Sequence, residues 1–244
     1  MVVVCMMTSS HRMVCRIVIV ITAACVVLLA LPLCAQDNYE IQVYGAETVA
    51  KGATMVELHS NYTPDGLTLD DHRAHETLEI THGISDWFET GFYIFTDAGG
   101  GDGWQFVGSH IRPRVRVPAD WNWPVGISLS TEFGYIRRKF SADTWTWELR
   151  PIVDKQVGRW YVSFNPAMET RFVFSPALNV KYDVTPKIAA GVEYYGGGGQ
   201  EQLFPSIDLN VSPDWEFNAG VGFGLTNSTD RLIIKMIIGR RFHR

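Results

Sequence analysis

The chain has 244 residues and a formal net charge of −5, with 46% hydrophobic and 19% charged residues. This length suffices for one large domain, and this balance excludes both a disordered chain and a helical membrane protein. The excess of acidic over basic side chains argues against nucleic acid as a partner.

The first 35 residues have the features of an export signal. Arg12 and Arg16 give a basic start, residues 17–33 form an apolar stretch, and the small Ala35 supplies a cleavage site. We therefore predict a signal peptide over residues 1–35. An uncleaved anchor helix is the alternative, which Pro32 makes less suitable.

All the cysteines lie within this leading segment. They are Cys5, Cys15, Cys25 and Cys34. After cleavage the chain would contain no thiol, so a disulfide framework and a cysteine metal site are both excluded for the mature protein.

From about Thr54 to Phe242 the chain alternates apolar and polar residues in runs of roughly ten, separated by turn signals. Residues 145–154 place Trp, Trp, Leu, Pro and Val on one face and Thr, Glu, Arg, Ile and Asp on the other. Side chains of a strand point alternately to opposite faces, so each run predicts a strand with one apolar face. Twelve strands are expected, near residues 54–63, 75–84, 86–96, 104–117, 125–138, 143–155, 159–166, 171–183, 186–196, 202–211, 214–225 and 230–242.

An even number of such strands after an export signal predicts an all-β fold, a transmembrane antiparallel up-and-down β-barrel over residues 53–244. The connections support it: those after even-numbered strands are compact, for example residues 85–86 and 118–124. Those after odd-numbered strands are mostly longer, for example residues 97–103 and 196–201. This alternation is typical of barrels of the cell outer membrane, with short periplasmic turns and longer outer loops.

Aromatic residues are expected to form two interfacial girdles where the barrel wall meets the edges of the membrane. Trp87, Phe88, Trp121, Trp123, Trp160, Tyr182 and Trp215 lie beside the short turns, and Tyr62, Tyr135, Trp145, Trp147, Tyr194 and Tyr195 lie toward the long loops. The expected partners are therefore outer-membrane lipid and, through the C-terminal strand, the barrel-assembly machinery.

The inward-facing positions of these strands carry charges of both signs. The candidates for lining or selecting in the lumen are Glu57, Glu89, His110, Arg112, Arg114, Arg116, Glu132, Glu148, Arg150, Lys181, Glu193, Asp208 and Lys235, and His59, Glu79, Asp154 and Arg241 share their face. One interpretation is a constriction that selects anions or polar solutes by fixed charge. The other is a static, salt-bridged core that closes the barrel. The sequence leaves both open.

Residues 36–52 precede the first strand and alternate only weakly, over residues 41–45. We expect a periplasmic lead-in by default. An extra strand pairing and a plug in the lumen are the alternatives.

A catalytic centre is not expected. Ser60 and His82 both face outward, as a lipid-facing hydrolase would require, but they lie at different heights on neighbouring strands. The glycine runs at residues 99–103 and 196–199 lack the Lys-Ser/Thr ending of a phosphate loop. We therefore predict neither an enzyme nor a cofactor.

A metal site is not expected either. His72 and His75 lie near Asp70 and Asp71 in the first long loop and could bind a divalent cation. An ordinary charged surface loop is the interpretation we favour.

Several segments resemble uncharacterised outer-membrane β-barrel proteins of Gram-negative bacteria, and most nearly the transporters associated with phenol meta-pathway degradation. The resemblance rests on residues 52–58, 174–178, 185–187, 191–196 and 237–242. It implies an outer-membrane channel or transporter for small solutes. The alternative function is a closed structural or surface-interaction barrel that acts through its extracellular loops.

Overall fold

The computed structural model describes residues 39–67, 70–99 and 101–243, so the expected signal peptide lies outside the described residues. Twelve strands make up nearly all of this part. They are β1 (Thr54–Asp65), β2 (Arg73–Ser85), β3 (Phe88–Ala98), β4 (Trp104–Arg116), β5 (Gly126–Ile136), β6 (Trp145–Val157), β7 (Trp160–Glu169), β8 (Val173–Thr185), β9 (Ile188–Gly197), β10 (Gln200–Ser212), β11 (Trp215–Gly224) and β12 (Leu232–Phe242). Two 3-10 turns, η1 (Ala119–Trp121) and η2 (Thr170–Phe172), lie between strands. None of the helices in the described part is long and apolar enough to span a membrane.

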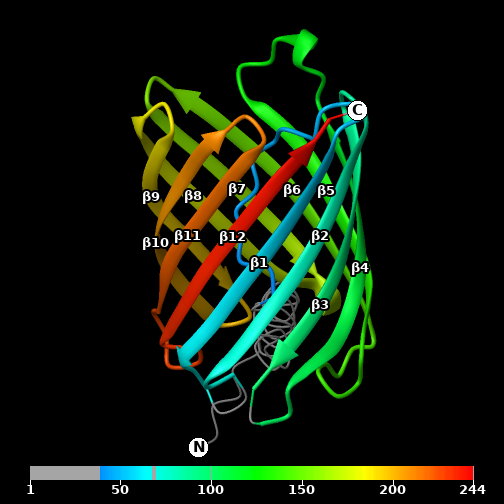
Figure 1. Cartoon of the computed structure of the whole chain (residues 1–244), viewed down its shortest axis with the longest axis vertical. Coiled ribbons are helices and arrows are strands. Elements are labelled where there is room, and N and C mark those ends of the chain that lie inside the picture. Colours follow the sequence, from blue (N-terminus) through cyan, green and yellow to red (C-terminus); the bar gives the residue numbers. More distant parts are fainter. Residues whose placement is uncertain (1–38, 68–69, 100, 244) are drawn as a thin grey trace, which may run out of the picture. The chain divides into compact units, whose positions relative to one another are not determined.

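Each strand pairs antiparallel with its neighbours in sequence, and β1 pairs with β12 to close the ring (Figure 1). Thr54 lies opposite Phe242 and Asp65 opposite Leu232, so the seam runs along both strands. The predicted fold is confirmed. The predicted strand ends agree within two residues, except that β7 extends three residues further.

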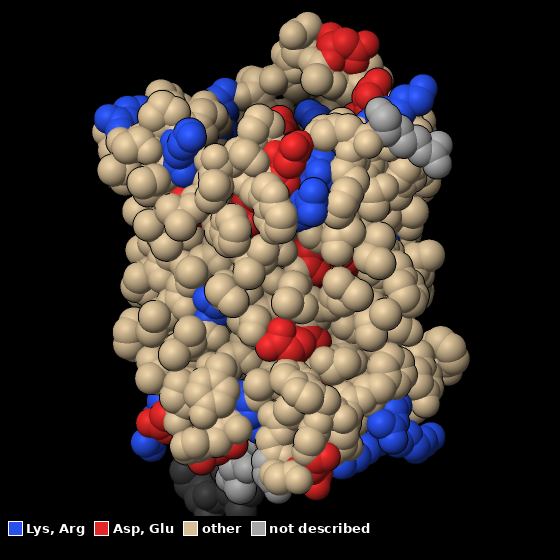
Figure 2. Space-filling view, viewed as in Figure 1, with Lys and Arg blue, Asp and Glu red and all other residues tan. Residues whose placement is uncertain are grey.

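The alternation of side chains produces an apolar outer wall. Outward residues such as Ile111, Phe133 and Phe223 are 52%, 61% and 47% exposed, whereas inward residues such as Glu79 and Thr77 are fully buried. Figure 2 shows many charged side chains toward the two ends of the molecule, with a few acidic and basic ones visible between them. A charge on a lipid-facing wall costs roughly 2–4 kcal/mol at the midplane, which accounts for this sorting.

Two connections differ from the prediction. The glycine run after β9 was expected to form a long loop, but Gly197 pairs with Gln200 and the connection is only residues 198–199. Gly198 and Gly199 have φ values of 58° and 86°, which glycine adopts without a steric penalty, so the chain reverses tightly. Conversely, the connection expected to be compact between β4 and β5 spans residues 117–125 and includes η1.

The segment before β1 lies inside the barrel. We call Tyr39–Val49 the inner segment; Figure 1 shows it in blue within the ring of strands. The Tyr39 carbonyl accepts a hydrogen bond from Thr77, near the long-loop end, whereas Val49 N donates to Glu89, near the short-turn end. Extended chain covers about 3.3 Å per residue, so eleven residues reach roughly 35 Å, close to the length of the wall.

Candidate functional site

Wall side chains satisfy the backbone of the inner segment. Tyr44 N donates to Asn165 Oδ1 at 2.8 Å, and Asn165 Nδ2 donates back to the Tyr44 carbonyl at 2.9 Å. Ala46 N donates to Asp154 Oδ2 at 2.8 Å, and Lys235 Nζ donates to the Ile41 carbonyl at 3.1 Å. A buried backbone group without a partner is costly, so these side chains replace the partner strand that the inner segment lacks.

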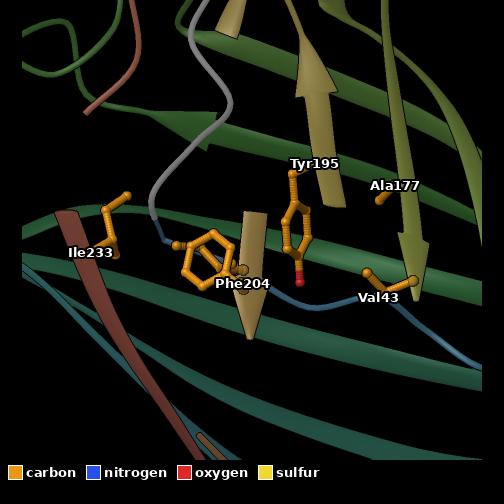
Figure 3. Packing of buried hydrophobic residues seen from close by; sticks show 6 residues of the cluster. Val43, Ala177, Tyr195, Phe204 and Ile233 are labelled. Carbon is orange, nitrogen blue, oxygen red and sulfur yellow. The ribbon is translucent and has the colours of Figure 1, made fainter. Parts of the chain in front are cut away.

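Apolar contacts fix the same segment sideways. Ile41 and Val43 are buried in a cluster with Ala177, Tyr195, Phe204 and Ile233 from the wall. Figure 3 shows Val43 facing Ala177 and Tyr195. The side chains of the inner segment therefore pack at fixed positions on the wall, and its backbone follows a fixed course through the lumen.

Three guanidinium groups surround the ring of Tyr44. The Cζ atoms of Arg112, Arg114 and Arg150 lie 4.7, 5.5 and 5.2 Å from its ring centroid. Each such contact contributes about 0.5–2 kcal/mol, more where water is excluded. The phenol of Tyr44 therefore links the inner segment to the cationic side of the lumen.

Two arginines of β4, Arg112 and Arg114, are paired with carboxylates on β2 and β3. Arg112 Nη2 lies 2.5 Å from Glu79 Oε1 and 3.7 Å from Glu89 Oε1. Arg114 Nε lies 2.9 Å from Glu89 Oε1, and its Nη2 also donates to the carbonyl of Glu47 in the inner segment. These two arginines are consequently held by the wall and cannot swing freely into a passage.

A second cluster lies on the opposite side, over β8 to β12. Lys235 Nζ is 2.5 Å from Glu193 Oε2, and Lys181 Nζ is 3.1 Å from Glu193 Oε1 and 2.7 Å from Asp208 Oδ2. Tyr195 Oη donates to Glu193 Oε2 at 2.5 Å. Glu193 thus compensates the charges of two buried ammonium groups.

Two smaller pairs lie toward the long loops. His110 Nδ1 lies 3.2 Å from Glu132 Oε2, and Thr146 Oγ1 lies 3.0 Å from His110 Nε2. Arg150 binds Glu148 in a two-pronged arrangement, with both N–O distances at 2.6 Å.

All the sequence-predicted lumen residues lie on the inward face. Buried among them are Glu57, Glu89, Arg112, Arg114, Glu132, Lys181, Glu193 and Lys235; half-buried are His110, Arg116, Glu148, Arg150 and Asp208. The structure brings all of them except Glu57 and Arg116 into separate paired clusters, and they do not form one ring of free charge. Arg116 and Arg241, with no carboxylate within 4.0 Å among the described residues, line the cavity at the short-turn end.

Three cavities inside the barrel adjoin the inner segment. One of about 800 Å³ opens at the short-turn end, one of about 170 Å³ lies under the long loops, and one of about 210 Å³ lies beside Lys181 and Glu193. Gln42 of the inner segment lines all three. It therefore occupies the point where these cavities meet.

Sequence reasoning missed the central residues of this site. Gln42 and Tyr44 belong to a segment whose weak alternation gave no strand, and nothing local shows that wall side chains bind it. Tyr195 was expected in the outer aromatic girdle but is 1% exposed and faces inward. Adjacent residues of a strand face opposite sides, so only Tyr194 of that pair can reach the lipid. The alternation of side chains along this strand is enough to place Tyr195 on the inward face.

The other candidates do not form sites. His82 lies opposite Thr54, six positions along β1 from Ser60, whose hydroxyl donates instead to Glu76. The separation expected from their heights is confirmed.

The histidines of the first long loop also serve separate pairs. His72 Nδ1 contacts Asp71 at 3.0 Å, whereas His75 Nδ1 contacts Asp97 at 3.1 Å and its Nε2 lies 3.8 Å from Asp70. They do not share a carboxylate in these contacts.

Comparisons with known proteins agree on the fold. The chain is similar to the KdgM porin, with 11% identity over 78% of this chain and 99% of that one and a TM-score of 0.55. It is also similar to the COG4313 outer membrane channel from Pseudomonas putida F1, with 12% identity over 83% and 100% and a TM-score of 0.56. The Acinetobacter baumannii outer membrane protein Omp33 matches with 10% identity over 82% and 100% and a TM-score of 0.53.

No protein-family model matches the chain, and no curated protein matches its sequence. At these identities the structural likeness establishes the fold of an outer-membrane barrel and not a substrate.

Proposed function

We propose that this protein is an outer-membrane channel for small solutes, with the inner segment as its constriction. The observation that carries the proposal is the position of Gln42, which lines three cavities inside the barrel. The apolar outer wall and the fold shared with outer-membrane porins and channels support a location in the outer membrane, with lipid around the wall.

The lining of the cavities suggests a preference for cations or neutral polar solutes. Under the long loops the lining includes five carboxylates, Glu40, Glu132, Asp143, Glu148 and Glu169, against Arg150 and His110. At the short-turn end six carboxylates, Glu47, Glu57, Glu79, Glu89, Asp154 and Glu216, stand against four arginines, Arg112, Arg114, Arg116 and Arg241. Fixed charge of one sign concentrates ions of the other sign in a narrow pore. The anion preference considered from the arginines of β4 is therefore not favoured.

The comparisons and the sequence resemblance suggest which solutes to try first. KdgM is described in complex with oligogalacturonate, which is polyanionic, and the acidic cavities of this chain do not favour that ligand. The resemblance to phenol meta-pathway transporters puts small aromatic compounds among the first candidates. The pocket under the long loops includes Tyr39, Phe95, Trp147 and Tyr195, which suit an aromatic ring.

Single-channel recording in a planar bilayer under a salt gradient tests the proposal. We expect small, discrete conductance steps and a reversal potential on the cation side. A variant lacking residues 39–48 should conduct several-fold more, because the strands remain and the inner segment does not. Silence from both proteins, each shown to be folded by its heat-shifted mobility in a gel, would contradict the channel and favour the closed barrel acting through its loops.

A further inference from the structure

Three potential metal ligands meet on the inward face of β1 and β2. Glu57 and His59 are two residues apart on β1 and therefore share a face, and Glu79 lies directly opposite Glu57 on β2. One ligand atom from each lies within 4.8 Å of the other two. Glu57 is 7% exposed, and His59 and Glu79 are fully buried.

The charges of this group are not balanced by the protein. Carboxylates directly opposite one another on antiparallel strands repel, and burial strengthens the repulsion. Arg112 compensates Glu79, but Glu57 has no cationic side chain within 4.0 Å among the described residues. The group therefore requires a proton or an additional cation.

His59 provides the second observation. Its ring is fully buried, and the Glu79 carboxylate is its one polar contact among the described residues. Nε2 is directed at the group, 3.4 Å from Glu79 Oε2. This contact is longer than an ordinary hydrogen bond, so a metal ion bound by both groups would give the buried imidazole a closer partner.

The surroundings already orient one ligand. Arg112 Nη2 and Thr81 Oγ1 both donate to Glu79 Oε1, at 2.5 and 2.6 Å, which leaves Oε2 toward His59. Hydrogen bonds of this kind hold ligating carboxylates in natural metal sites. Glu57 and Glu79 also line the cavity at the short-turn end, which gives an ion a route to them.

We infer that Glu57, His59 and Glu79 form a binding site for a divalent transition-metal ion, with zinc as the best fit. One imidazole nitrogen and two carboxylate oxygens match the ligand types of three-ligand zinc sites, in which water takes the fourth position. The sequence predicted no metal site. It did not reveal this one because the pairing of Glu57 with Glu79 depends on the register between β1 and β2. The site does not depend on the proposed channel.

Zinc binding to the folded, metal-stripped protein in detergent tests the inference. We expect one Zn²⁺ per chain by calorimetry, and a visible absorption band of low-symmetry Co²⁺ when Co²⁺ is used as the probe. His59→Gln and Glu57→Gln, which retain polarity and approximate volume, should each weaken Zn²⁺ binding at least tenfold and abolish the Co²⁺ band. His82→Gln, on the outward face of β2, should bind as the unaltered protein does.

Equal binding by all four proteins would overturn the assignment, because the ion would then sit elsewhere. The absence of stoichiometric binding to the unaltered, folded protein would also overturn it and would mean that the two carboxylates share a proton instead. Neither result bears on conductance, so failure here and failure of the proposed channel can be told apart.

Discussion

Asn165 binds the backbone of Tyr44 through both ends of its amide, accepting from the Tyr44 N–H and donating to the Tyr44 carbonyl. The pattern is the one a neighbouring strand would offer, condensed into a single side chain. Ser163 Oγ also donates to the Tyr44 carbonyl, so Asn165 is the side chain that holds both backbone groups of Tyr44.

Asn165→Leu should therefore loosen the inner segment. The substitution leaves the Tyr44 N–H without its acceptor at a buried position, at a cost of about 1–3 kcal/mol. We expect a higher conductance with frequent transitions between levels in single-channel recordings, and a lower urea midpoint. Asn179→Leu is the matched control, because Asn179 is also buried and inward, on the next strand, but lies opposite Ser163 and not the inner segment. Identical recordings from both variants would contradict this role.

Gln42→Cys should make the constriction accessible to chemistry. Cys5, Cys15, Cys25 and Cys34 all lie in the first 35 residues, so a protein prepared without that segment carries a single thiol. A positively charged methanethiosulfonate reagent should reduce conductance by more than half, because its adduct would fill the junction of the cavities. Ile111→Cys, on the lipid-facing wall, should show no change. Unchanged conductance after complete labelling at residue 42 would place the constriction elsewhere.

Glu193→Gln should destabilise the barrel more than any substitution of its neighbours. Removing one partner of a buried ion pair costs about 3–5 kcal/mol, and here Lys235 and Lys181 both lose a carboxylate. Asp208→Asn should cost less, because Lys181 keeps Glu193 and Asp208 is 27% exposed. Urea unfolding in detergent measures both; the reverse order of midpoints would contradict the assignment of Glu193 as the central carboxylate.

The long-loop end should lose stability as the pH rises. Burial, reinforced by the negative charge of Asp230, raises the pKa of Asp70 from 3.8 to about 6, although Arg73 opposes the shift. A carboxyl whose pKa is raised in the folded state favours folding while it is protonated, so its contribution is complete below pH 3.8 and lost by pH 6. The side chain is 35% exposed, so screening reduces the effect to on the order of 1 kcal/mol.

Asp70→Asn isolates this contribution. The variant and the unaltered protein should have equal unfolding free energies below pH 4, and the variant should be the more stable one above pH 6. Urea titrations at both pH values provide the comparison, and a constant difference across the range would exclude the ionisation of Asp70 as its cause.

The strands were predictable because each carries its own evidence. Residues 145–154 show alternation without any knowledge of their neighbours, and the wall position of residues such as Glu148 and Arg150 follows from parity. Pairing is a different matter. That Glu79 faces Glu57, or that Arg112 reaches both Glu79 and Glu89, depends on the stagger between strands, which the pattern of a single strand does not encode.

The inner segment was the least predictable feature for a related reason. Its backbone partners are side chains such as Asn165 and Asp154, more than one hundred residues away in sequence. The residues of the inner segment do not themselves indicate that these wall side chains bind it. The sequence did not distinguish a periplasmic lead-in, an extra strand and a plug, because a short, weakly alternating segment is compatible with all three.

The pairing of β1 with β12 joins residues that are almost the whole described chain apart. This seam cannot form until the last strand has been made, so the cylinder stays an open sheet until late in assembly. While the sheet is open, the inner segment can settle sideways against Asn165, Asp154 and Lys235. Once the seam is sealed, the same segment would have to be threaded lengthwise between paired charges. The topology therefore implies an order of assembly. The inner segment docks against the wall first, and β1 and β12 pair afterwards.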